Sequence, residues 1–79
     1  MTRKKLIEEI IYFSKVFNFI EWTVDENSIF INVENSLNDV SEVENYLYIF
    51  SKHLKWFTLD KKRFINFINE LQKVRDSLE

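Results

Sequence analysis

The sequence predicts a single α+β domain made of a helix, a β-hairpin and two further helices packed on one face of the hairpin. Near the N-terminus and again in the C-terminal half, apolar residues recur at three- and four-residue steps, which is the period of a helix. Between these stretches apolar and polar residues alternate, which is the period of a strand. Because 79 residues hold only one hydrophobic core, we expect one domain over residues 1–79.

The first helix is predicted over about residues 3–17. Thr2 precedes it and is placed as its N-cap, because a threonine hydroxyl can accept a hydrogen bond from a free backbone N–H of the first turn. The apolar stripe of this helix consists of Leu6, Ile7, Ile10, Phe13 and Phe17.

A β-hairpin is predicted to follow. Residues 20–24 and 29–33 alternate between apolar and polar, and the polar residues 25–28 between them are typical of a turn. With 25–28 as a four-residue loop, Trp22 lies opposite Ile31, and the apolar side chains of both runs fall on one face. The other face then carries Glu21, Thr23, Phe30, Asn32 and Glu34.

A second helix is predicted after a linker at residues 35–40. Ser41 and Glu44 have the spacing of a capping box, which indicates where this helix begins. Its apolar stripe runs to Phe57, so residues 54–59 are predicted to end the helix. Because Trp56 and its neighbours also favour strands, a short third strand at 54–59 is the alternative.

The third helix is predicted to begin after Asp60, which is placed as its N-cap. Leu59 and Phe64 flank this position with the spacing of a hydrophobic staple. The apolar face of this helix consists of Phe64, Phe67, Ile68, Leu71, Val74 and Leu78.

The composition excludes several classes of functional site. The chain has no glycine, proline or cysteine and a single histidine, His53. Without cysteine there is no thiolate site, without glycine there is no glycine-rich phosphate loop, and one histidine leaves no pair to hold zinc. No residue pair has a spacing that enforces nucleophile–base geometry. We therefore expect no enzyme activity, no cofactor and no metal site.

The same reading predicts a cytoplasmic protein with no membrane partner. The longest apolar runs are too short to span a bilayer. The basic N-terminus is followed by Glu8 and Glu9, which interrupt the apolar region that a signal peptide needs. The abundance of Ile, Phe, Lys and Asn suggests AT-rich coding DNA, which is associated with low-GC bacteria and their phages and plasmids.

Charge is segregated along the chain. Residues 16–51 contain seven acidic residues and no lysine or arginine, although the whole chain has a net charge of only −2. We expect an inhibitor or immunity-type module that occludes a basic site on a larger partner, such as a nuclease or another nucleic-acid-handling protein. The predicted partner-binding residues are Glu21, Asp25, Glu26, Phe30, Glu34 and Tyr48.

Two other functions remain open. Large side chains that fall off the apolar stripes, including Tyr12 and Tyr48, would suit a homodimer or a larger homo-oligomer. The basic run Lys61, Lys62 and Arg63, with two helices spaced loosely as in a helix-turn-helix, would suit nucleic-acid binding. The negative net charge makes nucleic acid the less favoured partner.

Overall fold

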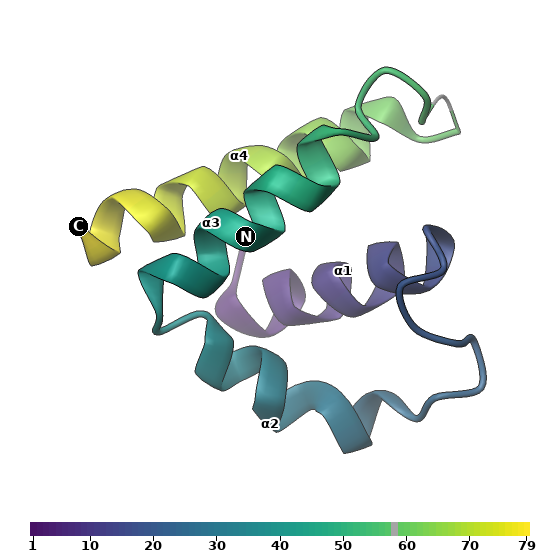
Figure 1. Ribbon diagram of the computed structural model, residues 1–79, viewed down its shortest axis with the longest axis horizontal. Coiled ribbons are helices and arrows are strands. Elements are labelled where there is room, and N and C mark those ends of the chain that lie inside the picture. Colours follow the sequence, from purple (N-terminus) through teal and green to yellow (C-terminus); the bar gives the residue numbers. More distant parts are fainter. Residues whose placement is uncertain (58) are drawn as a thin grey trace. The chain divides into compact units, whose positions relative to one another are not determined.

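The computed structural model describes residues 1–57 and 59–79, and these residues form helices joined by turns, without a strand. The helices are α1 (Arg3–Val16), α2 (Glu26–Ser36), α3 (Val40–Ser51) and α4 (Lys61–Leu78) (Figure 1). The predicted α+β class and its β-hairpin are therefore wrong. The chain divides into two compact units, Met1–Ser36 and Leu37–Glu79, and the single-domain assignment stays a prediction.

Helix α1 is the element that the sequence predicted most closely. The Thr2 side chain accepts a hydrogen bond from the Lys5 backbone N–H at 3.1 Å, which confirms it as the N-cap. The helix buries the apolar residues Leu6, Ile7, Ile10, Ile11 and Phe13.

The end of α1 shows how a chain without glycine stops a helix. Asn18 adopts the left-handed conformation, with φ of 62°. Its N–H donates to the Lys15 carbonyl at 3.1 Å, and the Phe19 N–H donates to the Ser14 carbonyl at 2.7 Å. These two bonds are those of a Schellman motif, in which glycine usually holds the left-handed position and asparagine is the common substitute.

This geometry predicts a selective response at position 18. A β-branched residue is strained in the left-handed region, so Asn18→Val lowers the free energy of unfolding by about 1–2 kcal/mol. Asn18→Gly, which relieves that strain, stays within about 0.5 kcal/mol of the wild type. Urea denaturation followed by circular dichroism measures both values, and equal stability of the two variants would contradict the motif.

Residues predicted as the second strand of the hairpin form α2 instead. Asp25 stands one residue before this helix, and its Oδ1 accepts a hydrogen bond from the Asn27 N–H at 3.1 Å, as an N-cap carboxylate does. Asp25 was interpreted as a turn residue, but aspartate is favoured in turns and at helix N-caps for the same reason: its short side chain reaches nearby backbone N–H groups.

The exposure of the side chains along α2 distinguishes the period of a helix from the period of a strand. Ile29, Phe30 and Val33, which share one side of a helix, are half-buried. Ile31, which a hairpin would place on the core face with Ile29, is 67% exposed. The helical period is therefore the one that the structure follows. An isolated two-stranded hairpin is also marginally stable, whereas a helix satisfies its backbone hydrogen bonds within itself.

Charge substitution at two isoleucines tests this arrangement. Ile31→Lys should change the free energy of unfolding by no more than about 0.5 kcal/mol, because Ile31 faces solvent. Ile29→Lys should cost about 1–3 kcal/mol, because it forces an ammonium group into a half-buried position. Chemical denaturation measures both variants, and an equal cost would favour the hairpin register, in which the two residues share a face.

In the first unit, α1 and α2 form a helical hairpin. The Arg3 guanidinium donates to the Glu34 carbonyl at 3.1 Å, which joins the start of α1 to the end of α2. The Lys15 ammonium donates to the Val24 carbonyl at 2.9 Å, which joins the end of α1 to the segment before α2. The chain therefore reverses direction between the two helices (Figure 1).

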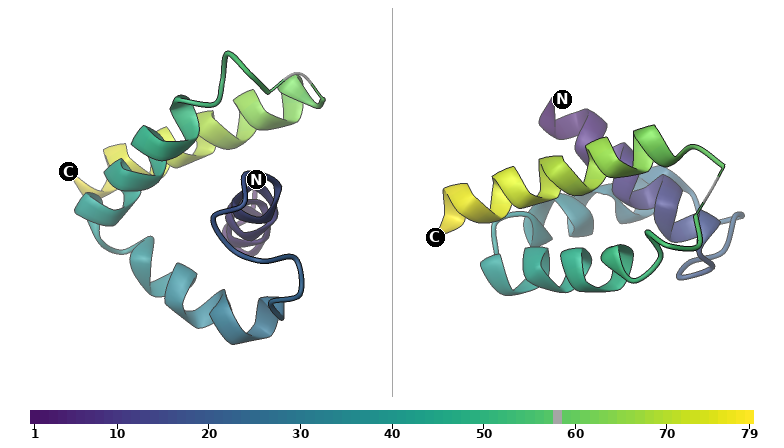
Figure 2. Two further views of the ribbon diagram at one scale, coloured as in Figure 1. Left: turned by 45° about the vertical axis from the view of Figure 1, so that its right-hand side comes forward. Right: turned by 90° about the horizontal axis from the view of Figure 1, so that it is seen from above.

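In the second unit, α3 and α4 lie side by side and run in opposite directions (Figure 2). Their contact is aromatic: the Phe50 ring is 5.0 Å from the Phe67 ring and 6.5 Å from the Phe64 ring, both edge to face. Such pairs contribute about 0.5–1.5 kcal/mol beyond the area they bury. The buried residues of α3 and α4 are Val43, Leu47, Phe50, Phe64, Phe67, Ile68 and Leu71, so four residues of the predicted third-helix face are confirmed as core.

The start of α3 differs from the prediction. The helix begins at Val40, and Asp39 is its N-cap, with Oδ1 accepting from the Ser41 N–H at 3.0 Å. The predicted capping box of Ser41 and Glu44 is therefore wrong, because both residues lie inside the helix. Asp60 is confirmed as the N-cap of α4, since its side chain accepts from the Arg63 N–H at 3.3 Å.

The segment after α3 is neither of the predicted structures. α3 ends at Ser51, and residues 52–56 form successive turns, with the Trp56 and Phe57 N–H groups both donating to the His53 carbonyl. The predictions for 54–59 also cover position 58, which lies outside the described residues. Leu59 is 91% exposed, so the predicted hydrophobic staple does not bury it.

Candidate functional site

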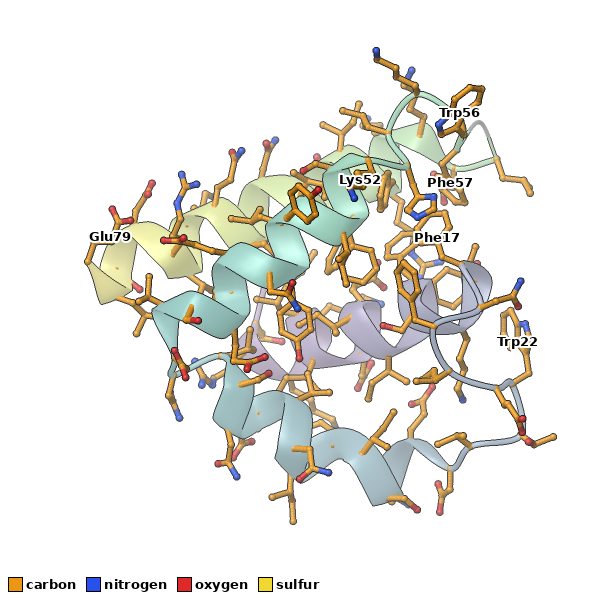
Figure 3. The ribbon with its side chains drawn as sticks, in the orientation of Figure 1. Phe17, Trp22, Lys52, Trp56, Phe57 and Glu79 are labelled. Carbon is orange, nitrogen blue, oxygen red and sulfur yellow. The ribbon has the colours of Figure 1, made fainter. Side chains whose placement is uncertain are left out.

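The connection between α1 and α2 is the first candidate site, and residues 19–26 are called the acidic loop. It carries three exposed carboxylates, from Glu21, Asp25 and Glu26. Two aromatic side chains on the same loop are also exposed, Phe19 at 44% and Trp22 at 60%. Figure 3 shows Trp22 on this connection. The acidic loop thus combines large aromatic side chains, which are enriched at protein interfaces, with negative charge, which can steer a basic partner.

The acidic loop is held to α1 by contacts at Trp22 and Val24, in the middle of the loop. The Trp22 ring packs edge to face on Tyr12 of α1, with centroids 6.3 Å apart. Lys15 is only 8% exposed, and its ammonium donates to the Val24 carbonyl at 2.9 Å. The Val24 N–H in turn donates to the Glu21 carbonyl at 3.2 Å, which closes a turn around Trp22. The loop is therefore fixed by specific bonds.

The hydrogen bond from the Lys15 ammonium to the Val24 carbonyl predicts that this ammonium group stabilises the fold. Lys15→Met roughly keeps the length of the side chain but removes the donor. It should lower the free energy of unfolding by about 1.5–3 kcal/mol, which is the usual contribution of a hydrogen bond to a charged group. Amide hydrogen exchange should show faster exchange at the Val24 N–H.

Lys4→Met provides the control, because Lys4 is exposed on the same helix. It should leave both the stability and the exchange rate unchanged. A Lys15→Met variant as stable as the control would show that the bond does not hold the loop.

The carboxylates of the acidic loop have no basic partner within the described residues. Glu21 Oε2 accepts a weak hydrogen bond from the Thr23 hydroxyl at 3.4 Å, and Asp25 caps α2. The printed sequence has no lysine or arginine between Lys15 and Lys52 to neutralise them. Their negative potential is therefore available to an external partner.

The other predicted partner-binding residues lie away from the acidic loop. Glu34 is exposed on α2, and its separation of eight positions from Glu26 corresponds to about 12 Å along the helix axis. Phe30 is half-buried on the side of α2 that also carries Ile29. Tyr48 belongs to the second unit, on α3, where it is 62% exposed. The structure therefore brings together Glu21, Asp25 and Glu26 from the predicted set.

The connection between α3 and α4 is the second candidate site. Six of its exposed side chains, those of Lys52, Lys55, Trp56, Leu59, Lys61 and Lys62, are called the basic loop; Asp60, which is also exposed, caps α4. The predicted nucleic-acid residues Lys61 and Lys62 are exposed in the first turn of α4, and Arg63 beside them is half-buried. Residues 52–60 separate two antiparallel helices, whereas a helix-turn-helix joins its helices at a steep angle through three or four residues. The helix-turn-helix geometry is therefore absent from the described residues.

Sequence reasoning missed the aromatic and aliphatic side chains of both loops. Trp22 was expected on the core face of a hairpin and Leu59 in a staple, yet they are 60% and 91% exposed. Trp56 is 79% exposed. One signal was present in the sequence: each tryptophan lies next to charged residues, Trp22 after Glu21 and Trp56 after Lys55.

Charged and titratable groups also lie away from the two loops. Among the described residues, no group of three His, Cys, Asp or Glu side chains could hold a metal ion. His53 is half-buried near the end of α3. Glu9 is 1% exposed on α1, and its carboxylate lies 3.3 Å from the Lys5 ammonium. Glu9 is therefore an ion-paired part of the α1 packing.

Comparison with known proteins gives no identification. No protein-family model, curated protein or solved structure matches the chain. Within the described residues, no helix is both long enough and apolar enough to cross a bilayer.

Proposed function

We propose that this chain is a small protein-binding module that docks its acidic loop on a basic surface of a larger partner and occludes that surface. The partner class that suits this chemistry is a protein whose own site is basic, such as a nuclease or another nucleic-acid-handling protein. An inhibitor or immunity-type role follows, because a module that covers such a site competes with the anionic substrate. The proposal places the module in the cytoplasm, as expected from its composition.

The observation that carries the proposal is the exposed Trp22 beside the carboxylates of Glu21, Asp25 and Glu26. Negative potential on one loop accelerates encounter with a basic surface. An aromatic ring that becomes buried on binding slows dissociation and contributes about 2 kcal/mol or more when it is a central contact. The hydrogen bond from Lys15 and the ring contact from Tyr12 support the proposal, because a loop fixed before binding loses little conformational entropy.

Charge reversal on the acidic loop tests the electrostatic part. The wild-type chain, immobilised through its C-terminus, is used to capture host proteins, and each captured partner is purified. Glu21→Lys with Glu26→Lys should lower the association rate constant at least tenfold at low salt, with a smaller effect at high salt. Asp76→Lys with Glu79→Lys is the matched control, since it makes the same change in net charge on exposed residues at the end of α4.

Truncation of the aromatic anchor tests the second part. Trp22→Ser should raise the dissociation rate constant about 30-fold or more, with little change in the association rate constant. Addition of the chain to the purified partner should inhibit the activity of that partner. Equal capture of every host protein by all variants and the control would overturn the proposal, and so would a stable homodimer in analytical centrifugation that buries the acidic loop.

A further inference from the structure

The basic loop exposes the two most accessible large apolar side chains of the described residues. Leu59 is 91% exposed and Trp56 is 79% exposed, whereas Phe57 beside Trp56 is 9% exposed. The Phe57 ring lies 5.1 Å from Phe64 of α4, so the turn is attached to the core of its own unit. Figure 3 shows Trp56 on the outer side of this turn. Folding therefore buries Phe57 and leaves its neighbours in water.

The charges around these side chains are almost all positive. Residues 45–69 contain five lysines and arginines and a single acidic residue, Asp60. The Asp60 carboxylate accepts a hydrogen bond from the Arg63 N–H at the start of α4, so it is already engaged with the positive end of that helix. Lys52, Lys55, Lys61 and Lys62 are exposed. Trp56 and Leu59 are therefore flanked along the chain by exposed lysines.

We propose that the basic loop docks on the surface of a bilayer that contains anionic lipids. Trp56 and Leu59 enter the boundary between headgroups and acyl chains, and the lysines contact the anionic headgroups. The sequence-based expectation of no membrane partner considered only spanning segments and a signal peptide. Surface docking needs neither, because two apolar side chains on a charged loop reach the interface while the helices stay in water.

Leu59 favours a lipid surface over a nucleic acid. A leucine side chain has no π-face on which a base can stack, and it makes no hydrogen bond to a base edge. In hydrocarbon the same side chain leaves water completely. Tryptophan is enriched at membrane–water interfaces because its ring is apolar and its N–H is polar.

The type of cation also favours a lipid surface. The exposed cations of the loop are lysines, whose long stems can lie against apolar surface while the ammonium stays in water. Nucleic-acid sites more often use the planar guanidinium of arginine. Tyr48 extends the surface on α3, where the Lys52 ammonium lies 4.0 Å above its ring. A tyrosine at this position is a further interfacial aromatic.

Tryptophan fluorescence with vesicles tests the proposal. Trp22→Phe leaves Trp56 as the sole tryptophan. Its emission should shift to the blue and the protein should sediment with vesicles of phosphatidylcholine and phosphatidylserine, but not with vesicles of phosphatidylcholine alone. Each lysine near an anionic surface contributes about fivefold to binding, so Lys61→Ser with Lys62→Ser should weaken binding roughly 30-fold.

Matched variants separate this docking from general charge attraction. Lys4→Ser with Lys73→Ser makes the same change in net charge on other exposed positions and should bind like the parent. Trp56→Ser with Leu59→Ser should abolish co-sedimentation without unfolding, since both side chains are exposed. The proposal is overturned if the control pair binds as weakly as the Lys61 and Lys62 pair, if Trp56 emission does not shift, or if an oligonucleotide binds the loop more tightly than the anionic vesicles.

Discussion

Each helix of the described residues begins where a side-chain oxygen accepts a backbone N–H, and the rest of the structure depends on this constraint. Thr2, Asp25, Asp39 and Asp60 stand directly before α1, α2, α3 and α4. Loss of such a cap lowers the free energy of unfolding by about 1 kcal/mol, because a backbone N–H at the helix start is left without its acceptor. The four caps therefore decide where the chain turns and which residues remain in the connections between helices.

The success of sequence reasoning varied with the length of each hydrophobic stripe. In α4 the stripe repeats over four turns, so Phe64, Phe67 and Leu71 could be placed in the core from their spacing alone. In α2 the apolar run is short, and Ile29 and Val33 fit a period of two through Ile31 as well as a helical period through Phe30. Periodicity cannot separate these alternatives over so few residues, and Asp25 could not separate them either, because aspartate is favoured both in turns and at helix N-caps.

The sequence predicted the charge of the candidate sites but not their exposed apolar side chains. Residues 16–51 contain no lysine or arginine, so the sequence alone identified this segment as acidic. The exposure of Trp22, Trp56 and Leu59 could not be predicted, because a large apolar residue is expected in a core unless its element is known to end before it. Both tryptophans lie in a connection between helices, Trp22 between α1 and α2 and Trp56 between α3 and α4.

The pairing of neighbouring helices has a consequence for how the chain acquires its structure. In both units the packed helices are consecutive, α1 with α2 and α3 with α4. Most contacts within a unit therefore join residues close together along the chain, and little loop entropy is lost before they form. Helical proteins with such local contacts complete folding in microseconds to milliseconds. Contacts between the two helices of a unit can therefore form early in folding, before contacts between residues far apart along the chain.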